Sequence, residues 1–176
     1  MLFIGLSMGG MVAQGLAIRH PGLVRGLVLA NTVARYPEAA RAAFEQRAQA
    51  VEQGGMAAVA DVVVERYLHA DFRAAQPEAA RALRELLLRC DAPAYAATCR
   101  AVGAVDWLDR LAEIRCPTLV IAGARDVGAT PALAQAIAER VPGAHLEVLA
   151  DASHLSVAEQ PEAFERLVRN ALSTFR

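Results

Sequence analysis

A serine, an aspartate and a histidine, the three residue types of a nucleophilic triad, stand at well-separated positions in this chain. Ser7 lies near the start, Asp126 follows an apolar run, and His154 follows another. A serine hydroxyl is a poor nucleophile until an imidazole accepts its proton. A carboxylate behind the imidazole fixes the tautomer of the ring and stabilises the cation that forms. These residues would therefore perform acyl transfer if the fold brought them together.

The sequence around Ser7, Gly5-Leu6-Ser7-Met8-Gly9, is a Gly-x-Ser-x-Gly pattern whose meaning depends on its flanking elements. Residues 2–4 form a short apolar run typical of a strand, and residues 8–20 have a helical pattern that ends at Pro-Gly. A sharp turn between them favours glycine at Gly5 and Gly9, and it leaves Ser7 strained with its hydroxyl exposed. We interpret Ser7 as a nucleophile; the alternative is a glycine-rich turn that binds an anion.

Three further apolar runs have the composition of strands buried in a parallel sheet, at residues 27–30, 116–123 and 144–149. Asp126 and His154 each lie just beyond one of these runs, as Ser7 lies beyond residues 2–4. Because the carboxyl ends of parallel strands meet at one edge of the sheet, we expect the three side chains to converge there. Their chain order, Ser then Asp then His, is that of the α/β-hydrolases.

Asp126 has alternatives as the acid of the triad. Taken alone, Asp126 could simply cap the helix that begins near residue 130. Asp151 stands only three residues before His154, where a role in a turn is more natural. Asn31 and Thr32 follow the second strand, so no carboxylate competes from that position. The combined placement favours Asp126.

The remaining histidines have structural explanations. His20 lies a full helix away from Ser7 and precedes Pro-Gly, as a helix-capping residue does. His69 falls in a helical segment and His145 within a predicted strand, which favours structural or solvated roles for both. His154 remains the candidate base.

Residues 35–113 contain no convincing strand. They contain only alanine-rich helical segments, which are broken at Pro37, Gly54-Gly55, Pro77 and Pro93. We predict four or five short helices there, of which residues 59–68 and 79–90 are the clearest amphipathic pieces. The predicted organisation is a core at 1–34, a helical lid at 35–115 and a core at 116–176, which ends in an amphipathic helix at 162–175. An insertion at the active end of a sheet tends to cover the pocket there; a plain helical subdomain is the alternative.

Composition excludes several function classes. The net charge is −1, and the 18 basic residues are all arginines interleaved with acids, so the chain lacks the basic patch of a nucleic-acid-binding protein. Although 55% of the residues are hydrophobic, alanine dominates them, and no run approaches the ~20 residues of a spanning helix. No signal peptide is visible. Cys90, Cys99 and Cys116 lack metal-ligand spacing, which favours reduced, mostly buried thiols in a cytoplasmic protein.

Four segments carry a resemblance to a known family: Gly5-Leu6-Ser7-Met8-Gly9-Gly10-Met11-Val12, Leu27-Val28-Leu29-Ala30-Asn31-Thr32, Pro117-Thr118-Leu119-Val120-Ile121-Ala122-Gly123, and His154-Leu155-Ser156 followed by Glu159-Gln160-Pro161-Glu162-Ala163-Phe164. With these segments the whole chain resembles the 3-oxoadipate enol-lactonases of the α/β-hydrolase superfamily. The triad motifs belong to the entire superfamily, and only the residues around them suggest the lactonase. The chain departs from the family pattern at Val157, where we expect an asparagine, and in a slightly longer segment after Asp126.

This resemblance implies that Ser7 is the nucleophile, His154 the base, Asp126 its partner, and the backbone N–H of Met8 one oxyanion donor. It also implies hydrolysis of a small enol-lactone or carboxylic ester during the breakdown of aromatic compounds. Neither a metal nor an organic cofactor is implied, because the triad supplies both nucleophile and base. The predicted fold is a partial α/β-hydrolase fold with about four parallel strands, flanking helices and an all-helical lid.

The substrate-binding residues are less defined. We name Trp107, Tyr95 and Arg100 as candidates, since an arginine would suit a substrate that carries a carboxylate. The same triad also supports C–C bond hydrolysis, acyl transfer or cofactor-free haloperoxidation, and the fold does not separate these reactions.

Members of the superfamily carry several strands, and a loop with a second oxyanion donor, ahead of the motif that here begins at Gly5. We therefore expect the chain to correspond to the carboxyl-terminal part of such a fold. The strand at residues 2–4 would then present an apolar edge that invites self-association. That exposed edge predicts poor solubility. One oxyanion donor in place of two typically costs ~10² to 10³ in rate, so we also expect little activity. A non-catalytic fragment, or a partner that completes another chain's sheet, is the alternative.

Overall fold

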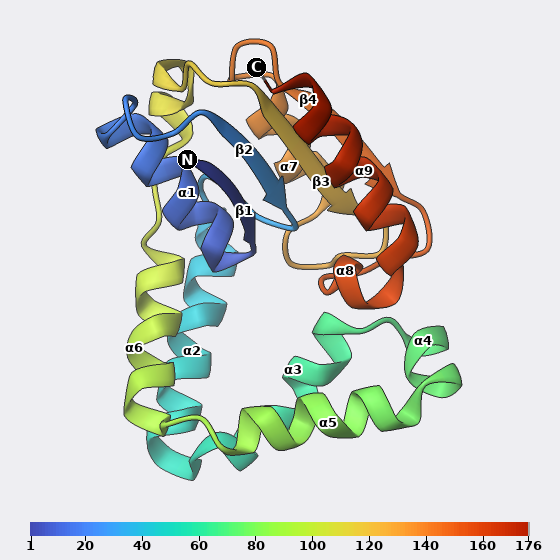
Figure 1. The fold of residues 1–176 in the computed structure, drawn as a ribbon. Helices are drawn as coiled ribbons and strands as arrows, with labels where there is room; N and C mark the ends of the chain where they lie inside the picture. Colours follow the sequence, from blue (N-terminus) through green and yellow to red (C-terminus); the bar gives the residue numbers. More distant parts are fainter. Residues whose placement is uncertain (176) are drawn as a thin grey trace. The chain divides into compact units, whose positions relative to one another are not determined.

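The computed structural model describes residues 1–175, and a parallel sheet of four strands lies at the centre of its larger unit (Figure 1). The strands follow one another in the order β1-β2-β3-β4. They are β1 (Leu2–Leu6), β2 (Gly26–Ala30), β3 (Thr118–Gly123) and β4 (His145–Leu149). Every predicted strand is therefore present and within two residues of its predicted ends, which confirms the α/β architecture.

Helices follow the strands in the larger unit. They are α1 (Met8–Arg19), α7 (Pro131–Ala138), α8 (Ser156–Glu159) and α9 (Pro161–Thr174), with a short 3₁₀ helix, η2, at Leu108–Glu113. The helix α1, which follows the sharp turn at Ser7 (the elbow), and the final helix α9 match the predicted ranges. The helix α7 begins at Pro131, as the Thr130-Pro131 pair indicates. The single turn of α8, directly after His154, was not predicted, because four residues are too few to show a helical period.

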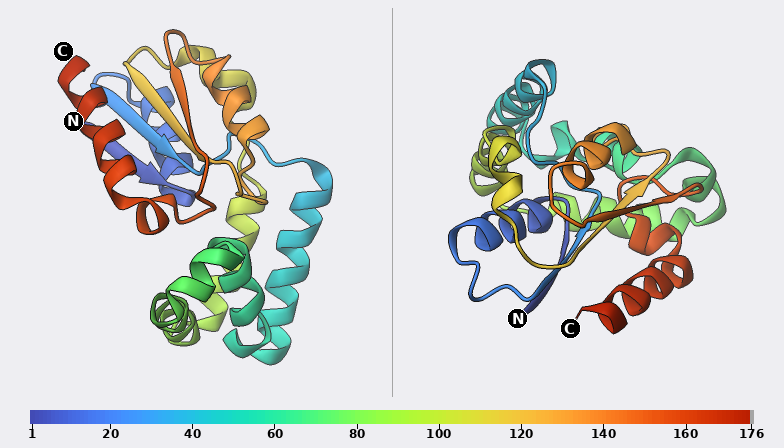
Figure 2. Two further views of the ribbon diagram at one scale, coloured as in Figure 1. Left: turned by 90° about the vertical axis from the view of Figure 1, so that its right-hand side faces the viewer. Right: turned by 90° about the horizontal axis from the view of Figure 1, so that it is seen from above.

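Side-chain alternation along the strands builds two apolar layers. Leu27 and Leu29 of β2 pack with residues of α1 and α7 on one face of the sheet. Val28 and Ala30 pack with α9 on the other face. Figure 2 shows α9 and α7 on opposite sides of the strands. All five residues of β2 are buried, which is why this strand is continuously apolar rather than alternating.

Strand register aligns the carboxyl ends of the strands. Leu6 of β1 pairs with Ala30 of β2, and Ala30 pairs with Ile121 of β3. The pairing continues past the named strands, since the N–H of Ser7 donates to Ala30 O at 2.9 Å. The N–H of Asn31 likewise donates to Ile121 O at 2.8 Å. Ser7 and Asn31 therefore lie next to each other at the carboxyl ends of β1 and β2, and each is hydrogen-bonded to the neighbouring strand.

The helical insertion is narrower than predicted. The contacts divide the chain into a sheet unit, Met1–Arg35 together with the chain from Asp106 onward, and a helical unit, Tyr36–Val105. Residues 106–115, assigned to the lid from the sequence, belong to the sheet unit because Leu111 and Ile114 are buried in its core. An ion pair of 2.6 Å between Arg35 Nε and Asp106 Oδ1 joins the two points where the chain leaves and re-enters this unit.

The helical unit has its own core. Its elements are α2 (Glu38–Gly54), η1 (Met56–Ala58), α3 (Ala60–Tyr67), α4 (Ala70–Ala75), α5 (Pro77–Leu88) and α6 (Ala92–Gly103). Its buried residues include Val51, Met56, Val63 and Cys99. Pro77 opens α5 at its first turn, whereas Pro37 precedes α2 at the capping position. The lid role of this unit stays a prediction.

Membrane-spanning helices, metal-ligand groups and cysteine burial can each be checked in the described part of the chain. Within residues 1–175, no helix combines the length and apolarity that crossing a membrane demands. The same residues contain no group of three His, Cys, Asp or Glu side chains placed to hold a metal ion. Cys99 is buried and Cys116 half-buried, but the expectation of burial is wrong for Cys90, which is exposed in the turn after α5.

Candidate active site

Ser7 occupies a strained position between β1 and α1. Its φ of 52° and ψ of −118° lie in a region that non-glycine residues rarely adopt, at a cost of about 1–3 kcal/mol. A serine at a helix N-cap usually accepts a hydrogen bond from the helix, but the Ser7 hydroxyl makes no such bond. The hydroxyl instead lies 2.9 Å from the Nε2 atom of His154.

The glycines around Ser7 do not all have the predicted role. A Cβ on Gly5 would lie 2.5 Å from the carbonyl carbon of Gly9, so the turn requires glycine there, as expected. A Cβ on Gly10 would lie 2.7 Å from Thr32 Cβ. A Cβ on Gly9, by contrast, would meet nothing within 4 Å apart from its chain neighbours and the nearby backbone of its own helix, so the clash expected at Gly9 is wrong. Gly9 tolerates a side chain because it is exposed in the first turn of α1.

The His154 ring connects Ser7 to Asp126. Its Nδ1 atom lies 2.8 Å from Asp126 Oδ2, and its Nε2 atom lies 2.9 Å from Ser7 Oγ. An ionised carboxylate only accepts hydrogen bonds, so Nδ1 carries the proton and donates a hydrogen bond to Asp126. The Nε2 atom of the neutral ring is then an acceptor, oriented to take the proton of the Ser7 hydroxyl.

The Asp126 carboxylate is buried and accepts several hydrogen bonds. Its Oδ1 atom accepts from the N–H groups of Gly128 and Ala129 at 2.8 and 2.9 Å. Its Oδ2 atom accepts from His154 and, at 3.2 Å, from Asn31 Nδ2. Burial alone would raise the pKa of Asp126, but the bonds and charge of His154 and the two backbone N–H groups hold that pKa below its usual value.

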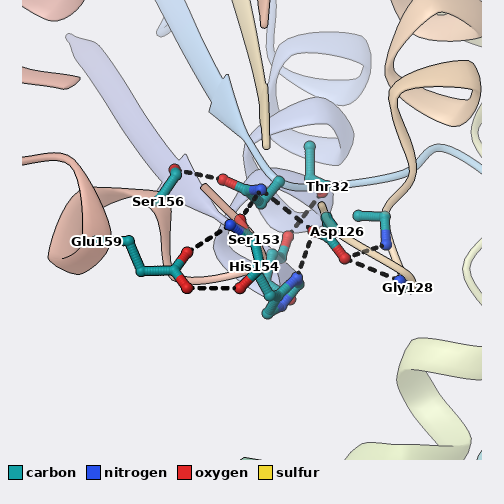
Figure 3. A network of polar contacts seen from close by, with 10 residues as sticks. Thr32, Asp126, Gly128, Ser153, His154, Ser156 and Glu159 are labelled. Carbon is teal, nitrogen blue, oxygen red and sulfur yellow. Dashed lines mark hydrogen bonds and ion pairs between the residues drawn. The ribbon is translucent and has the colours of Figure 1, made fainter. Parts of the chain in front are cut away.

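The loop that carries His154 is held by polar side chains on its far side. Glu159 of α8 accepts hydrogen bonds from the N–H of Ser153 at 2.5 Å and from Ser153 Oγ at 2.8 Å (Figure 3). Ser156 Oγ donates to Asn31 Oδ1 at 2.5 Å. Sequence reasoning assigned no role to these residues. From the sequence, Asn31 indicates only that no carboxylate follows the second strand, and no local pattern marks a polar side chain whose partners lie far away in the chain.

The other candidate acids and bases lie apart from this line of contacts. Asp151 is exposed and pairs with Arg125 at 3.0 Å. His20 follows the last residue of α1, and His145 is exposed in β4. His69 precedes α4, where its ring accepts a hydrogen bond from the N–H of Phe72. Each of these placements agrees with the structural role expected from the sequence.

Met8 is the first residue of α1. The first N–H groups of a helix have no intrahelical acceptor, and the helix dipole favours negative charge beside them. The Met8 N–H therefore has the properties of an oxyanion donor next to the Ser7 hydroxyl. No side chain is needed for this role, so residue type at position 8 carries little information about it.

The three candidate substrate contacts have other partners. Trp107 packs against Gly15, where a Cβ would lie 2.8 Å from its ring, and Arg19 lies over that ring at 4.9 Å. Arg100 is exposed and bridges from α6 to two glutamates of α2, with ion pairs to Glu45 at 3.0 Å and Glu52 at 2.6 Å. These carboxylates raise the pKa of Arg100.

Tyr95 is half-buried in the core of the helical unit, where burial raises its pKa to about 12. Its hydroxyl therefore stays protonated at neutral pH. The assignment of Trp107, Tyr95 and Arg100 to substrate binding stays a prediction.

Comparison with known proteins places these residues in a family. The model of the family described as serine aminopeptidase, S33, matches residues 1–161. The chain is 38% identical to 3-oxoadipate enol-lactonase 2 of Acinetobacter baylyi over 98% of its own length and 64% of that protein. It is 29% identical to the pimeloyl-[acyl-carrier protein] methyl ester esterase of Neisseria meningitidis, over 95% of its own length and 67% of that protein.

Among solved structures, the enol-lactonase from Burkholderia xenovorans superimposes with a TM-score of 0.90 at 35% identity. The match covers 97% of this chain and 65% of that one. These matches confirm the predicted fold class and the resemblance to the enol-lactonases. The chain spans just under two thirds of the length of the enol-lactonases that it matches.

Proposed function

Because this chain belongs to the serine aminopeptidase S33 family of α/β-hydrolases, we propose that it is a serine hydrolase that cleaves carboxylic ester bonds. The proposed catalytic triad is Ser7, His154 and Asp126. The proposed substrate is a small enol-lactone or carboxylic ester. One observation carries the proposal: an unbroken line of hydrogen bonds runs from Ser7 Oγ through both nitrogens of His154 to Asp126 Oδ2.

In the first step, His154 Nε2 takes the Ser7 proton while Ser7 Oγ attacks the carbonyl carbon of the substrate. The carbonyl oxygen becomes an oxyanion, for which the N–H of Met8 and the amino end of α1 provide stabilisation. Asp126 stabilises the imidazolium that forms. Its low pKa suits this role, because Asp126 must stay ionised while the neighbouring ring gains a positive charge.

In the second step, the imidazolium gives its proton to the leaving oxygen as the carbonyl–oxygen ester bond breaks. The product is an acyl group on Ser7 and, for a lactone, a hydroxyl or enol still joined to that acyl group. His154 then activates a water molecule that attacks the acyl carbon, and the carboxylic acid leaves as Ser7 recovers its proton. The reaction needs no redox partner.

The substrate class rests on the relatives. The proteins with the higher identities are named as lactonases, and the Neisseria relative is named as a methyl ester esterase. All these names describe attack on a carboxylic ester carbonyl, which supports ester over amide hydrolysis. Among esters, the 38% identity to a 3-oxoadipate enol-lactonase favours a small lactone.

Labelling with a fluorophosphonate tests the nucleophile, because this probe reacts covalently with activated serines. We expect slow labelling of the wild-type chain, in line with the low activity expected from its sequence, and loss of that labelling in Ser7→Ala and in His154→Ala. Equal labelling of wild type and Ser7→Ala, or no labelling of folded wild-type protein, would overturn the proposal. A second assay compares hydrolysis of 3-oxoadipate enol-lactone with that of short p-nitrophenyl esters. Faster turnover of the lactone is expected, and cleavage of the esters alone would replace the lactonase assignment with an esterase.

A further inference from the structure

Asn31 has a side chain that touches both loops of the proposed triad. Its side chain is buried, with the residue only 1% exposed. Its Nδ2 atom donates to Asp126 Oδ2 at 3.2 Å and to the carbonyl oxygen of Ser153 at 2.8 Å. Its Oδ1 atom accepts from Ser156 Oγ at 2.5 Å. The donor and the acceptor of this amide are therefore both used, and the partners lie in the loop of the acid, in the loop of the histidine and at the start of α8.

The backbone of Asn31 is held by the sheet itself. Asn31 directly follows β2, and its N–H donates to Ile121 O of the neighbouring strand at 2.8 Å. Its φ of 45° is left-handed, a conformation that asparagine tolerates better than most residues. The side-chain amide thus projects from a rigid element toward two loops.

Two consequences follow for the proposed acid–base pair. Asp126 Oδ2 is the atom that accepts from His154, so the Asn31 bond restrains the same oxygen on which the ring depends. The bond to Ser153 O restrains the residue directly before His154. One amide therefore limits both the rotation of the carboxylate and the position of the ring.

We propose that Asn31 is a positioning residue that holds Asp126 and the His154 loop in register for proton transfer from Ser7. The inference rests on the proposed function and adds a residue to it. The hydrogen bonds of the Asn31 side chain go to Asp126, Ser153 and Ser156, whereas Ser7 Oγ pairs with His154, so Asn31 acts through Asp126 and His154 rather than on the substrate. Ser156 completes the arrangement, because its hydroxyl orients the amide so that Nδ2 points to Asp126 (Figure 3 shows Ser156 and Asp126).

The chain offers a matched control. Gln14 of α1 is also a fully buried amide, and its Nε2 atom donates to Gly10 O at 3.2 Å and to Val33 O at 3.1 Å. These partners are backbone carbonyls outside the triad. Replacing Gln14 removes a buried amide of similar kind without changing the contacts of Asp126 or His154.

The test uses Asn31→Gly, since glycine adopts the left-handed backbone freely and so removes the side chain without strain. Gln14→Leu is the control, and fluorophosphonate labelling is measured from acid to neutral pH, normalised to the folded fraction. We expect Asn31→Gly to react about 10-fold or more slowly at neutral pH, as for loss of a hydrogen bond to a charged group. The acid limb of its pH–rate profile should also move to higher pH. Without the Asn31 donor, Asp126 Oδ2 binds the ring proton more strongly and the imidazolium persists.

The other ionisable groups near the pair stay unchanged in this comparison. They are Glu159 of α8 and the ion pair of Arg125 and Asp151 on the two loops. We expect Ser156→Ala to shift the profile in the same direction by less, and Gln14→Leu to lower stability without moving it. Labelling of Asn31→Gly as fast as the wild type, with an unshifted acid limb, would overturn the positioning role.

A separate measurement distinguishes this inference from the proposed function. The Nδ1 proton of His154 is followed by NMR in both proteins, which requires no catalysis. We expect its resonance to move or broaden in Asn31→Gly, because the acceptor oxygen is no longer restrained. An unchanged resonance contradicts the positioning role, whether or not the serine is labelled. Absent labelling of the wild-type protein contradicts only the proposed function.

Discussion

The hydroxyl of Thr32 donates a hydrogen bond of 2.7 Å to the carbonyl oxygen of Ser7, so the strained elbow is tied to the end of the neighbouring strand. The same oxygen also accepts from the N–H groups of Gly10 and Met11 at 3.0 and 3.2 Å. Thr32 is buried and lies against Gly10. The backbone of Ser7 is thus held in its left-handed conformation from both strand and helix.

We expect Thr32→Val, which keeps the shape but removes the donor, to lower the free energy of unfolding by about 1 kcal/mol. The loss stays modest because Ser7 O retains two backbone donors. Labelling by fluorophosphonate should slow as the elbow relaxes. Urea unfolding and labelling kinetics measure the two effects, with Thr32→Ser as the variant that keeps the hydroxyl. Equal stability of Thr32→Val and wild type would contradict the importance of this bond.

The two outer glycines of the motif should respond very differently to alanine. Gly5→Ala places a Cβ against the backbone of Gly9, so the elbow must open, and we expect labelling of Ser7 to fall below detection. Gly9→Ala places a Cβ in open space, and we expect a folded protein that is still labelled. Circular dichroism checks the fold of each variant. Similar loss of labelling in both would show that the packing around the elbow is not the reason for the motif.

Asp126 makes the stability of the protein depend on pH. Its pKa is lowered in the folded state, so the folded protein binds this proton less tightly than the unfolded chain does. The contribution is fully present above the usual aspartate pKa of about 3.9 and is lost as the pH falls through the lower folded pKa. We expect Asp126→Asn to be less stable than wild type at neutral pH, with the difference shrinking below about pH 4.

Urea unfolding at several pH values measures this difference. Asp151→Asn is the control, since Asp151 is exposed and its pair with Arg125 is solvated. We expect the stability of that variant to follow the wild type across the whole range. A constant difference between Asp126→Asn and wild type from neutral to acid pH would contradict the assignment of a low pKa to Asp126.

The edge of the sheet at β1 is the proposed site of self-association. Within residues 1–175, β1 pairs only with β2, and Leu2 and Ile4 on its surface are 48% and 54% exposed. Ile4 also lines an apolar groove with residues of α9, among them Phe164 and Val168. We expect the wild-type chain to form oligomers at high concentration and Ile4→Lys to reduce them, because a charge on an edge strand opposes pairing.

Sedimentation velocity over a range of concentrations measures this association. Val62→Lys is the matched control, since Val62 is similarly exposed but lies in α3 of the helical unit. A monomeric wild-type chain, or equal effects of the two lysine variants, would contradict association through β1.

Local patterns were enough to predict the sheet and the members of the proposed triad. A short apolar run, a glycine turn and an amphipathic period each report on a few neighbouring residues, and these define β1, the elbow and α1. Parallel pairing then brings the ends of the strands together as a geometric consequence. Ser7, Asp126 and His154 could be named because each lies in the segment that follows the carboxyl end of a strand, so no knowledge of side-chain packing was needed.

Other features depend on contacts between residues far apart in the chain, and only the tertiary structure decides them. Asn31 reaches its partners across sequence separations of 95 and 122 residues, which no local pattern records. Leu111 and Ile114 belong to the sheet unit because that core buries them, although their sequence resembles the helical insertion before them. The sequence by itself therefore determined which elements form and where the reactive side chains leave them. The register and packing of those elements decided which polar groups hold the reactive side chains in place.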